Sequence, residues 1–250
     1  MTATINQAPE PPSAPPEPPV RCGRCPRLAA YRGENIARYP HWFNGAAPSA
    51  GDAAAPLLIV GLAPGLRGAN RTGRPFTGDA SGALLTATLI KFGFAAARDG
   101  EDAALREVMI TNAVRCAPPG NKPTAAEITA CRPHLAARIN AMPRLKAILC
   151  LGRVAHDSTL RVFGRKLASA PFSHGARHAI GPLMLFDSYH CSRYNTQTGR
   201  LTPLMFETLF AEIKTLLDAA ARDTARRHGA CVASTGGVRS ERGAIRGSQA

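Results

Sequence analysis

Four short, nearly continuous apolar runs recur through the middle of the chain, and polar segments separate them. The runs are Leu57–Val60, Val108–Val114, Ala147–Leu151 and Leu183–Phe186. Apolar runs of this length, without polar alternation, are typical of strands that are covered on both faces. The pattern therefore predicts a central, mainly parallel four-stranded sheet.

Helical periodicity fills the intervals between these runs and follows the last one. The predicted helices are Ser81–Phe92, Thr124–Met142, Val154–Val162 and Pro203–Ala221. Thr124 and Glu127 have the spacing of a capping box, and Pro143 is placed to end that helix. Strands that alternate with helices predict an α/β protein, here a three-layer α/β/α sandwich.

The two ends of the chain differ in composition from the middle. Residues 1–20 are dominated by Pro with Ala and Glu, a composition typical of extended, unpacked chain. Residues 222–250 are rich in Arg, Gly, Ser and Ala and offer little to bury. We therefore expect one domain over residues 21–221, between a disordered N-terminal tail and a disordered basic C-terminal tail.

The charge balance narrows the class of partner. The chain has 31 Lys and Arg against 17 Asp and Glu, a formal net charge of +14. Such an excess attracts a polyanion, and nucleic acid is the leading candidate; a solvated basic surface or tail would give the same excess. Neither an apolar stretch long enough for a bilayer nor a secretion leader is evident. We expect a soluble cytoplasmic protein, associated with the nucleoid.

A glycine-rich loop, Gly61–Asp79, follows the first apolar run directly and carries three arginines and Phe76. A strand that opens into such a loop is where an α/β protein builds its site, because glycine lets the backbone approach a ligand. The loop matches neither the phosphate-loop pattern nor the dinucleotide pattern with its acidic residue. The loop sequence therefore argues against both nucleotide-binding interpretations.

Four cysteines form two pairs that could converge on one metal centre: Cys22, Cys25, Cys116 and Cys131. The lack of a secretion signal argues against disulfides. A structural zinc ion, an iron–sulfur cluster and unrelated free thiols remain as alternatives. Cys150 lies within an apolar run and is interpreted as core, and Cys231 falls in the C-terminal tail.

A third segment, Ser188–Thr202, follows the last predicted strand and precedes the last helix. In a parallel sheet it emerges at the same carboxyl edge as the glycine-rich loop, so the two loops should face each other.

Taken together, four segments of the chain resemble the family 5 uracil-DNA glycosylases. They match in order, and the resemblance covers the chain from Cys22 to Leu216; the segments are Gly61–Gly65, Asn70–Asp79, Thr111–Cys116 and His190–Thr196. Family 4 enzymes share the cysteine framework, but usually carry an acidic residue where this chain has Leu62 and Ala63. Their last motif usually reads His-Pro-Ser, whereas Cys191 replaces the proline here. Family 5 is the better match.

The resemblance implies a monofunctional DNA glycosylase of base excision repair; the sequence leaves its oligomeric state open, with a monomer as the default for such enzymes. Such an enzyme flips a deaminated base out of the duplex and hydrolyses its N-glycosidic bond, leaving an abasic site. Family 5 members resemble one another in accepting uracil, hypoxanthine and xanthine. The matched loops contain no lysine that would form a Schiff base with the sugar, which favours simple hydrolysis.

The resemblance also implies the residues of the base pocket: Gly61, Ala63, Gly65, Phe76, Asn112 and His190. Phe76 would stack on the flipped base, an interaction of about 1–3 kcal/mol. The Asn112 amide, a donor and an acceptor, would read the edge of uracil. His190 would donate to the base oxygen where negative charge develops. The alternative roles are core packing for Phe76, turn formation for Asn112 and a purely structural role for His190.

Asp79 is the nearest carboxylate in the matched run, and the first motif offers no side-chain acceptor to hold water. We expect Asp79 to stabilise the positive sugar or to orient water. The alternative is an N-cap of the following helix. We predict that Asp79→Ala reduces base release, followed on a uracil duplex, more than it reduces DNA binding. Equal losses in the two measurements would indicate a capping role.

The remaining implied residues contact DNA or hold a metal centre. Near the phosphates we expect Arg67, Asn70 and Arg71, and in the space left by the flipped base Ser192, Arg193 and Tyr194. By the resemblance, the four cysteines hold a structural 4Fe-4S cluster, with zinc as the competing metal.

Two other functions fit part of the pattern. A non-catalytic, metal-stapled nucleic-acid-binding module would satisfy the charge and the cysteines, but gives no reason for Phe76, Asn112 and His190 to lie in matching loops. An iron–sulfur electron carrier would not explain the basic excess.

Overall fold

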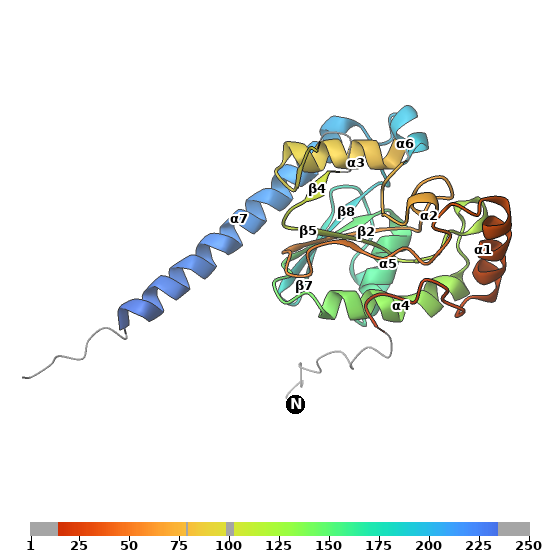
Figure 1. The fold of residues 1–250 in the computed structure, drawn as a ribbon. Coiled ribbons are helices and arrows are strands. Elements are labelled where there is room, and N and C mark those ends of the chain that lie inside the picture. The colour runs from red at the N-terminus through yellow and green to blue at the C-terminus, as the bar shows by residue number, and fades with distance from the viewer. Residues whose placement is uncertain (1–14, 79, 99–102, 235–250) are drawn as a thin grey trace, which may run out of the picture.

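Four parallel strands form the centre of the protein in a computed structural model that describes residues 15–78, 80–98 and 103–234 (Figure 1). They lie in the order β5 (Val108–Asn112), β2 (Leu57–Gly61), β6 (Ala147–Leu151) and β8 (Leu183–Ser188). All residues of β2, β5 and β6 are buried. The four predicted strands and their parallel arrangement are confirmed.

Two further strands extend the sheet at its edges, both antiparallel to their neighbours. β1 (Ala50–Gly51) pairs with β5, and β7 (Arg177–Ile180) pairs with β8, which makes a six-stranded sheet rather than the four-stranded one predicted. β1 is too short to give a pattern, and β7 alternates exposed and less exposed residues instead of forming an apolar run. A separate pair, β3 (Ala95–Ala96) and β4 (Ala104–Leu105), lies outside this sheet.

Helices cover both faces of the sheet, which confirms the three-layer α/β/α sandwich (Figure 1). On one face lie α3 (Ala80–Lys91) and α7 (Pro203–Ser234), whose Leu85, Leu89, Phe206, Phe210 and Ile213 pack on Leu57 and Ile59. On the other lie α4 (Ala125–Asn140) and α5 (Arg153–Val162), whose Leu135, Ile139, Ala155 and Leu160 pack on Leu58 and Val60. Alternate residues of β2 thus supply the two cores.

Three helices lie in segments where no helix was predicted. They are α1 (Pro26–Arg38), α2 (Ala69–Thr72) and α6 (Arg193–Gln197). The buried positions of α1 are Leu28, Arg32 and Asn35, so two of its three buried side chains are polar and the buried face is not an apolar one. By contrast, the predicted capping box of α4 is confirmed, since Glu127 N donates to Thr124 Oγ1 and Thr124 N donates to the Glu127 carboxylate.

Part of the expected N-terminal tail packs against the domain. Glu17 forms ion pairs of 2.5 Å with Arg115 and with Arg138, and the Pro15 carbonyl oxygen lies 2.7 Å from His134 Nδ1. Residues 15–20 of the expected disordered tail are therefore packed. Proline favours extended chain, but an extended chain still packs where a charged side chain meets a buried partner. The rest of that tail, residues 1–14, lies outside the described residues.

The last helix is longer than predicted. α7 does not end near Ala221 but continues to Ser234, and Figure 1 shows it projecting beyond the rest of the domain. Among the side chains that the structure describes on this helix, Leu217 is the last one in the buried core. The residues after it are rich in Ala and Arg, which sustain a helix by propensity alone. Residues 235–250 of the predicted tail lie outside the described residues. No helix in the described part of the chain could span a membrane.

The Glu17 carboxylate gives a testable account of the N-terminal packing. Burial raises the pKa of Glu17, but Arg115 and the bonds from Ser49 and Arg138 outweigh it and hold the pKa below the ordinary value of 4.5. A carboxylate with a depressed pKa stabilises the fold above the unfolded pKa, and this stabilisation is lost as the pH falls through the folded value.

We predict that Glu17→Gln lowers the free energy of unfolding at pH 7 by about 2 kcal/mol. It leaves the Arg115 guanidinium buried without its counter-charge, and the partial exposure of Glu17 reduces the cost of a fully buried pair. Urea unfolding from pH 7 to pH 3 measures this loss of stability. The difference in the free energy of unfolding between the variant and the unsubstituted protein should vanish below the pKa of Glu17. Glu34→Gln, on the exposed side of α1, is the matched control. A pH-independent difference would contradict the role of the charge.

Candidate active site and cysteine centre

The carboxyl ends of β2 and β5 bring two predicted site residues together. Gly61 and Asn112 are direct neighbours in the parallel register. The pairing continues past both strands, because Ala113 N donates to Gly61 O at 2.9 Å and Val114 N donates to Leu62 O at 3.0 Å. The start of the glycine-rich loop is therefore held rigidly against the residues that follow Asn112.

A pocket of about 320 Å³ opens at this edge of the sheet, between the glycine-rich loop and the loop after β8. Its walls come from both loops and from the ends of β5, α2 and α3; they are Leu62, Ala63, Pro64, Gly65, Ala69, Phe76, Ser81, Asn112, Asn121, His190 and Ser192. Five of the six residues predicted to bind the base line this pocket, and Gly61 lies beneath it. The expectation that the two loops face each other is confirmed.

A larger cavity of about 780 Å³ lies on the other side of Phe76, along α3. Its walls are mainly apolar, and Arg74 is the one charged side chain among the described residues that line it. The smaller pocket is the better candidate site, because it combines an amide, an imidazole and an aromatic ring.

Phe76 has a backbone conformation that bulky residues rarely adopt. Its φ is +54°, in the left-handed region, and a Cβ on Gly82 would lie 2.0 Å from the Phe76 carbonyl oxygen. The ring faces that of His190, with 6.2 Å between centroids and 28° between planes. A strained backbone that aims an aromatic ring into a pocket is typical of a functional position. Phe76 also packs against the core, so both of its predicted roles are compatible.

The glycine at position 61 is explained by its neighbours. A Cβ there would lie 2.4 Å from Asn112 Oδ1 and 2.8 Å from Phe76 Cζ. Asn112 is 4% exposed and lines the pocket. The close approach of Asn112 Oδ1 to position 61 thus helps to fix the amide at the pocket wall.

His190 lies between β8 and α6 in a loop that is fixed at several points. Asn195 Nδ2 donates to the His190 carbonyl oxygen at 2.8 Å, and Ser192 caps α6 by accepting from Asn195 N. Cys191, at the position where family 4 enzymes usually have proline, is fully buried, and its thiol lies 3.5 Å from the Ser81 carbonyl oxygen. The cysteine therefore ties the loop to α3 where a proline would stiffen it.

The residues predicted to contact DNA are placed in two ways. Four are exposed around the pocket, namely Arg67, Arg71, Arg193 and Tyr194, and Ser192 lines the pocket itself. Asn70 is 2% exposed and donates its amide to Asn44 Oδ1 at 2.9 Å. The Asn70 side chain therefore fixes α2 from inside, and its placement near a phosphate stays a prediction. Asp79 lies outside the described residues.

Three residues at this edge of the sheet were not predicted. Asn121, with a φ of +57°, lines the pocket, and the turn sequence before it was the available signal. A second hollow of about 320 Å³ shares His190 and contains Arg153 and Arg200. The guanidinium of Arg200 lies 4.6 Å from the Tyr189 ring centroid. Arg153 follows β6 at the same carboxyl edge, which the strand pattern had already located.

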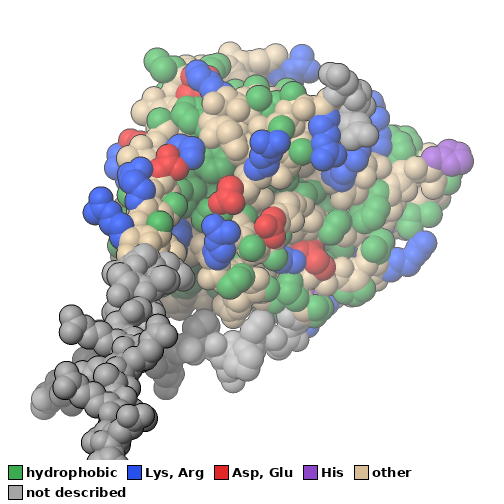
Figure 2. All heavy atoms as spheres, turned by 60° about the vertical axis from the view of Figure 1, so that its left-hand side comes forward, with side chains coloured by type: hydrophobic (Ala, Val, Ile, Leu, Met, Phe, Trp, Pro, Cys, Tyr) green, Lys and Arg blue, Asp and Glu red, His purple; other side chains and the backbone are tan. Residues whose placement is uncertain are grey.

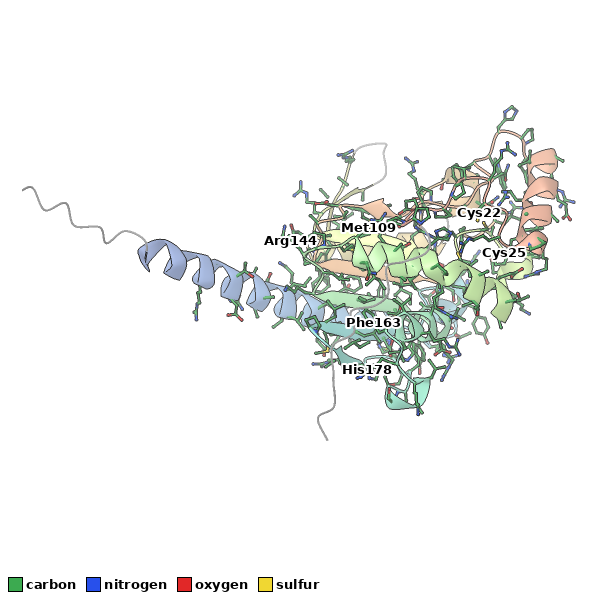
Figure 3. The ribbon with its side chains drawn as sticks, turned by 90° about the horizontal axis from the view of Figure 1, so that it is seen from below. Cys22, Cys25, Met109, Arg144, Phe163 and His178 are labelled. Carbon is green, nitrogen blue, oxygen red and sulfur yellow. The ribbon has the colours of Figure 1, made fainter. Side chains whose placement is uncertain are left out.

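The four predicted metal-binding cysteines surround one small cavity, together with Leu28 and Val114. Cys22 and Cys25 lie beside α1 (Figure 3), Cys116 follows β5, and Cys131 lies on α4. Two sulfurs receive hydrogen bonds from arginines: Arg115 N donates to Cys131 Sγ at 3.3 Å, and Arg32 Nη1 to Cys116 Sγ at 3.6 Å. The expected convergence of the two pairs is confirmed.

Burial is the main cause of the raised pKa of three of these thiols, Cys25, Cys116 and Cys131. It raises the pKa of Cys116 to about 11 and the pKa of Cys131 to about 12, and it also raises the pKa of Cys25. Thiols in such a site become thiolates when a metal displaces their protons. The donor set, four sulfurs with amide and guanidinium donors beside them, fits a metal centre.

The face of the molecule on the side of α7 carries mixed charges. In Figure 2, acidic side chains lie among the Lys and Arg side chains of this face. The basic excess of the chain is therefore not displayed there as an uninterrupted surface.

The geometry places an amide, an imidazole and a strained aromatic ring around one pocket at the carboxyl edge of a parallel sheet. Residues 48–214 match the sequence profile of the Uracil DNA glycosylase superfamily, and the chain belongs to this superfamily. Within it, the chain is 44% identical over 205 residues to the "Type-5 uracil-DNA glycosylase" of Thermus thermophilus, covering 78% of this chain and 93% of the relative. The type-5 enzyme of Pyrobaculum aerophilum is 40% identical over 192 residues, covering 73% and 83%. The type-5 family assignment is confirmed.

Proposed function

We propose that the protein is a monofunctional DNA glycosylase of base excision repair that removes uracil, and also hypoxanthine and xanthine, from DNA. The observation that carries the proposal is the meeting of Phe76, Asn112 and His190 in one pocket. The names of the type-5 relatives support uracil as the base. The backbone-lined first motif, which lacks a polar side chain, supports a broader range of bases.

In this proposal the pocket holds the flipped base. Phe76 stacks on its ring, and the Asn112 amide donates to one group of its edge and accepts from another. His190 donates to a base oxygen. As the N-glycosidic bond breaks, negative charge moves onto the base, so this hydrogen bond strengthens in the transition state. Because burial of the base excludes water, each of these contacts acts at a lower effective dielectric constant.

The sugar is left with positive charge, and the chain must stabilise it. Leu62 and Ala63 provide no carboxylate or amide for an attacking water. The proposed reaction is therefore dissociative, with bond cleavage well ahead of water attack, and Asp79 is the proposed counter-charge for the oxocarbenium ion. Water then adds to the sugar and leaves an abasic site.

The proposed DNA contacts surround the pocket. Arg67 and Arg71 bind phosphates, and Arg193 with the 72% exposed Tyr194 occupies the space that the flipped base leaves. Arg153 and Arg200 add a second pair of cations beside His190. The salt dependence of binding should reflect the number of these phosphate contacts.

For the cysteine centre we propose a structural 4Fe-4S cluster held by Cys22, Cys25, Cys116 and Cys131. A tetrahedral zinc ion with sulfur at about 2.3 Å would bring its thiolates roughly 3.8 Å apart. Among the described residues, no three of these sulfurs lie within 4.8 Å of one another. This wider spacing supports a cluster, which the four thiolates would hold, over a single zinc ion. When bound, the cluster joins α1, α4 and the segment after β5 beside the pocket.

We predict that Cys131→Ser removes the iron and the visible absorption of the purified protein and lowers its melting temperature. A hydroxyl is a poor ligand for iron, and the three remaining thiols cannot complete the site. Iron content, absorption spectrum and thermal unfolding measure the effect. Cys231→Ser, at a position on α7, is the control and should change none of them. An equal content of zinc in place of iron would contradict the cluster.

The function is tested with end-labelled duplexes that contain one uracil or one hypoxanthine. Each reaction is analysed on a denaturing gel with and without alkali. Cleavage only after alkali would support a monofunctional glycosylase. Cleavage without alkali would indicate a lyase or nuclease, and an unchanged strand in the presence of DNA binding would favour a non-catalytic binding module.

A further inference from the structure

A second group of ligand-type side chains lies away from both the pocket and the cysteines. It consists of His156 on α5, His178 on β7 and Asp187 on β8, with side chains 1%, 16% and 0% exposed. One ligand atom from each residue lies within 4.8 Å of those of the other two. Figure 3 shows His178 on its strand, well separated from Cys22 and Cys25.

The orientation of His156 is set by a backbone carbonyl group. Its Nε2 lies 2.9 Å from the Ala170 carbonyl oxygen and therefore carries a proton. Its Nδ1 faces Asp187 Oδ1 at 2.8 Å. A histidine that donates one nitrogen to a backbone carbonyl keeps the lone pair of the other nitrogen for a metal ion. The 2.8 Å between Nδ1 and Asp187 Oδ1 is less than the roughly 3.4 Å between two ligands of a tetrahedral ion, so these two atoms must separate slightly when an ion binds.

The other two residues have buried atoms without a hydrogen bond. Asp187 Oδ2 and His178 Nε2 are 3.3 Å apart, but they are not in hydrogen-bonding geometry, and neither has another partner in the described chain. An unsatisfied buried polar atom is costly. Two ligand atoms at about 2.1 Å from a tetrahedral ion lie roughly 3.4 Å apart, close to the observed spacing. The two atoms are thus placed to bind a third atom between them.

We propose that His156 Nδ1, His178 Nε2 and the Asp187 carboxylate bind a divalent transition-metal ion, for which Zn²⁺ is the best fit. Two imidazoles and a carboxylate are ordinary zinc ligands, and the partial exposure of His178 leaves an entry path and a position for water. The imidazole rings of His156 and His178 lie 5.6 Å apart at 65°.

The competing arrangement contains no ion. A doubly protonated His156 would then donate to Ala170 and to Asp187, as a buried ion pair. That arrangement accounts for Asp187 Oδ1 but leaves Asp187 Oδ2 and His178 Nε2 without partners. A metal ion satisfies all three side chains. The ion would also connect α5 and the edge strand β7 to β8 at Asp187, which lies three residues before His190.

Metal content tests the proposal directly. Tag-free protein with its cysteine centre intact is incubated with excess zinc and gel-filtered, and zinc and iron per chain are measured by plasma mass spectrometry. We expect about one zinc ion per chain. His178→Ala should lower this content at least about tenfold without changing the iron. His174→Ala, which alters a nearby histidine outside the group, should retain the zinc.

X-ray absorption at the zinc edge of the unsubstituted protein gives a second measurement that does not depend on a variant folding. Nitrogen and oxygen ligands, including two imidazoles, are expected. Sulfur ligation would place the zinc at the cysteines and overturn the proposal. Less than about a tenth of a zinc ion per chain, or undiminished zinc in His178→Ala, would also overturn it.

Discussion

Gly61→Ala should lower the rate of base release by at least about a hundredfold while the protein folds normally. The added methyl group would lie 2.4 Å from Asn112 Oδ1 and 2.8 Å from Phe76 Cζ, so both side chains must move. A displacement of about 1 Å at a reacting centre costs a factor of this order. Gly61 is not among the glycines with positive φ, so alanine fits the backbone of β2. Single-turnover rates on a uracil duplex, beside thermal unfolding, measure the two effects.

Gly33→Ala is the matched control, because it adds the same methyl group where no atom lies within 4 Å. Gly33 is within α1, where alanine is the better helix former by about 0.5–1 kcal/mol. This variant should keep full activity and gain a little stability. A Gly61→Ala enzyme with more than a third of normal activity would show that the contact between Gly61, Asn112 and Phe76 does not shape the site.

Asn112→Ala should reduce base release by about a thousandfold, because it removes a buried hydrogen-bonding group from the pocket wall. The loss should fall on the single-turnover rate. Binding to a duplex that already contains an abasic site should change by less than about threefold, because the phosphate contacts remain. Rate and affinity are measured on the same preparations.

Asn121→Gly provides the comparison for Asn112→Ala. It removes the other asparagine of the pocket, and glycine retains the left-handed backbone at this position. We expect a rate within about threefold of normal, since Asn121 is exposed at the rim and has no packed position. If Asn121→Gly lost much activity and Asn112→Ala lost little, the base edge would be contacted by Asn121 at the pocket rim and not by Asn112 at the end of β5.

The centre of the fold was predictable because fully buried strands leave an unmistakable local pattern. Four apolar runs became β2, β5, β6 and β8, and the order of strands and helices implied the edge at which the site lies. The edge strands β1 and β7 were missed because one has two residues and the other is largely exposed. A short or half-exposed strand is defined by its neighbour in space, and no pattern along the chain records it.

The site residues, too, were only partly predictable from the sequence. Phe76, Asn112 and His190 were identified from the resemblance, and the structure places them around one pocket. Asn70 belongs to the same motif, but its burial against Asn44 depends on a partner 26 positions away. The pair of His156 and Asp187 spans 31 positions, so the sequence contains no spacing that would reveal it.

Arg115 links two parts of the molecule that are far apart along the chain. Its backbone N–H donates to Cys131 Sγ, and its guanidinium group binds Glu17. We therefore expect a change at the cysteines to affect, through this one residue, the first segment that the structure describes, which contains Glu17. Protease resistance around Glu17, measured on a gel, would then report the state of the cysteine centre without any measurement of metal or activity.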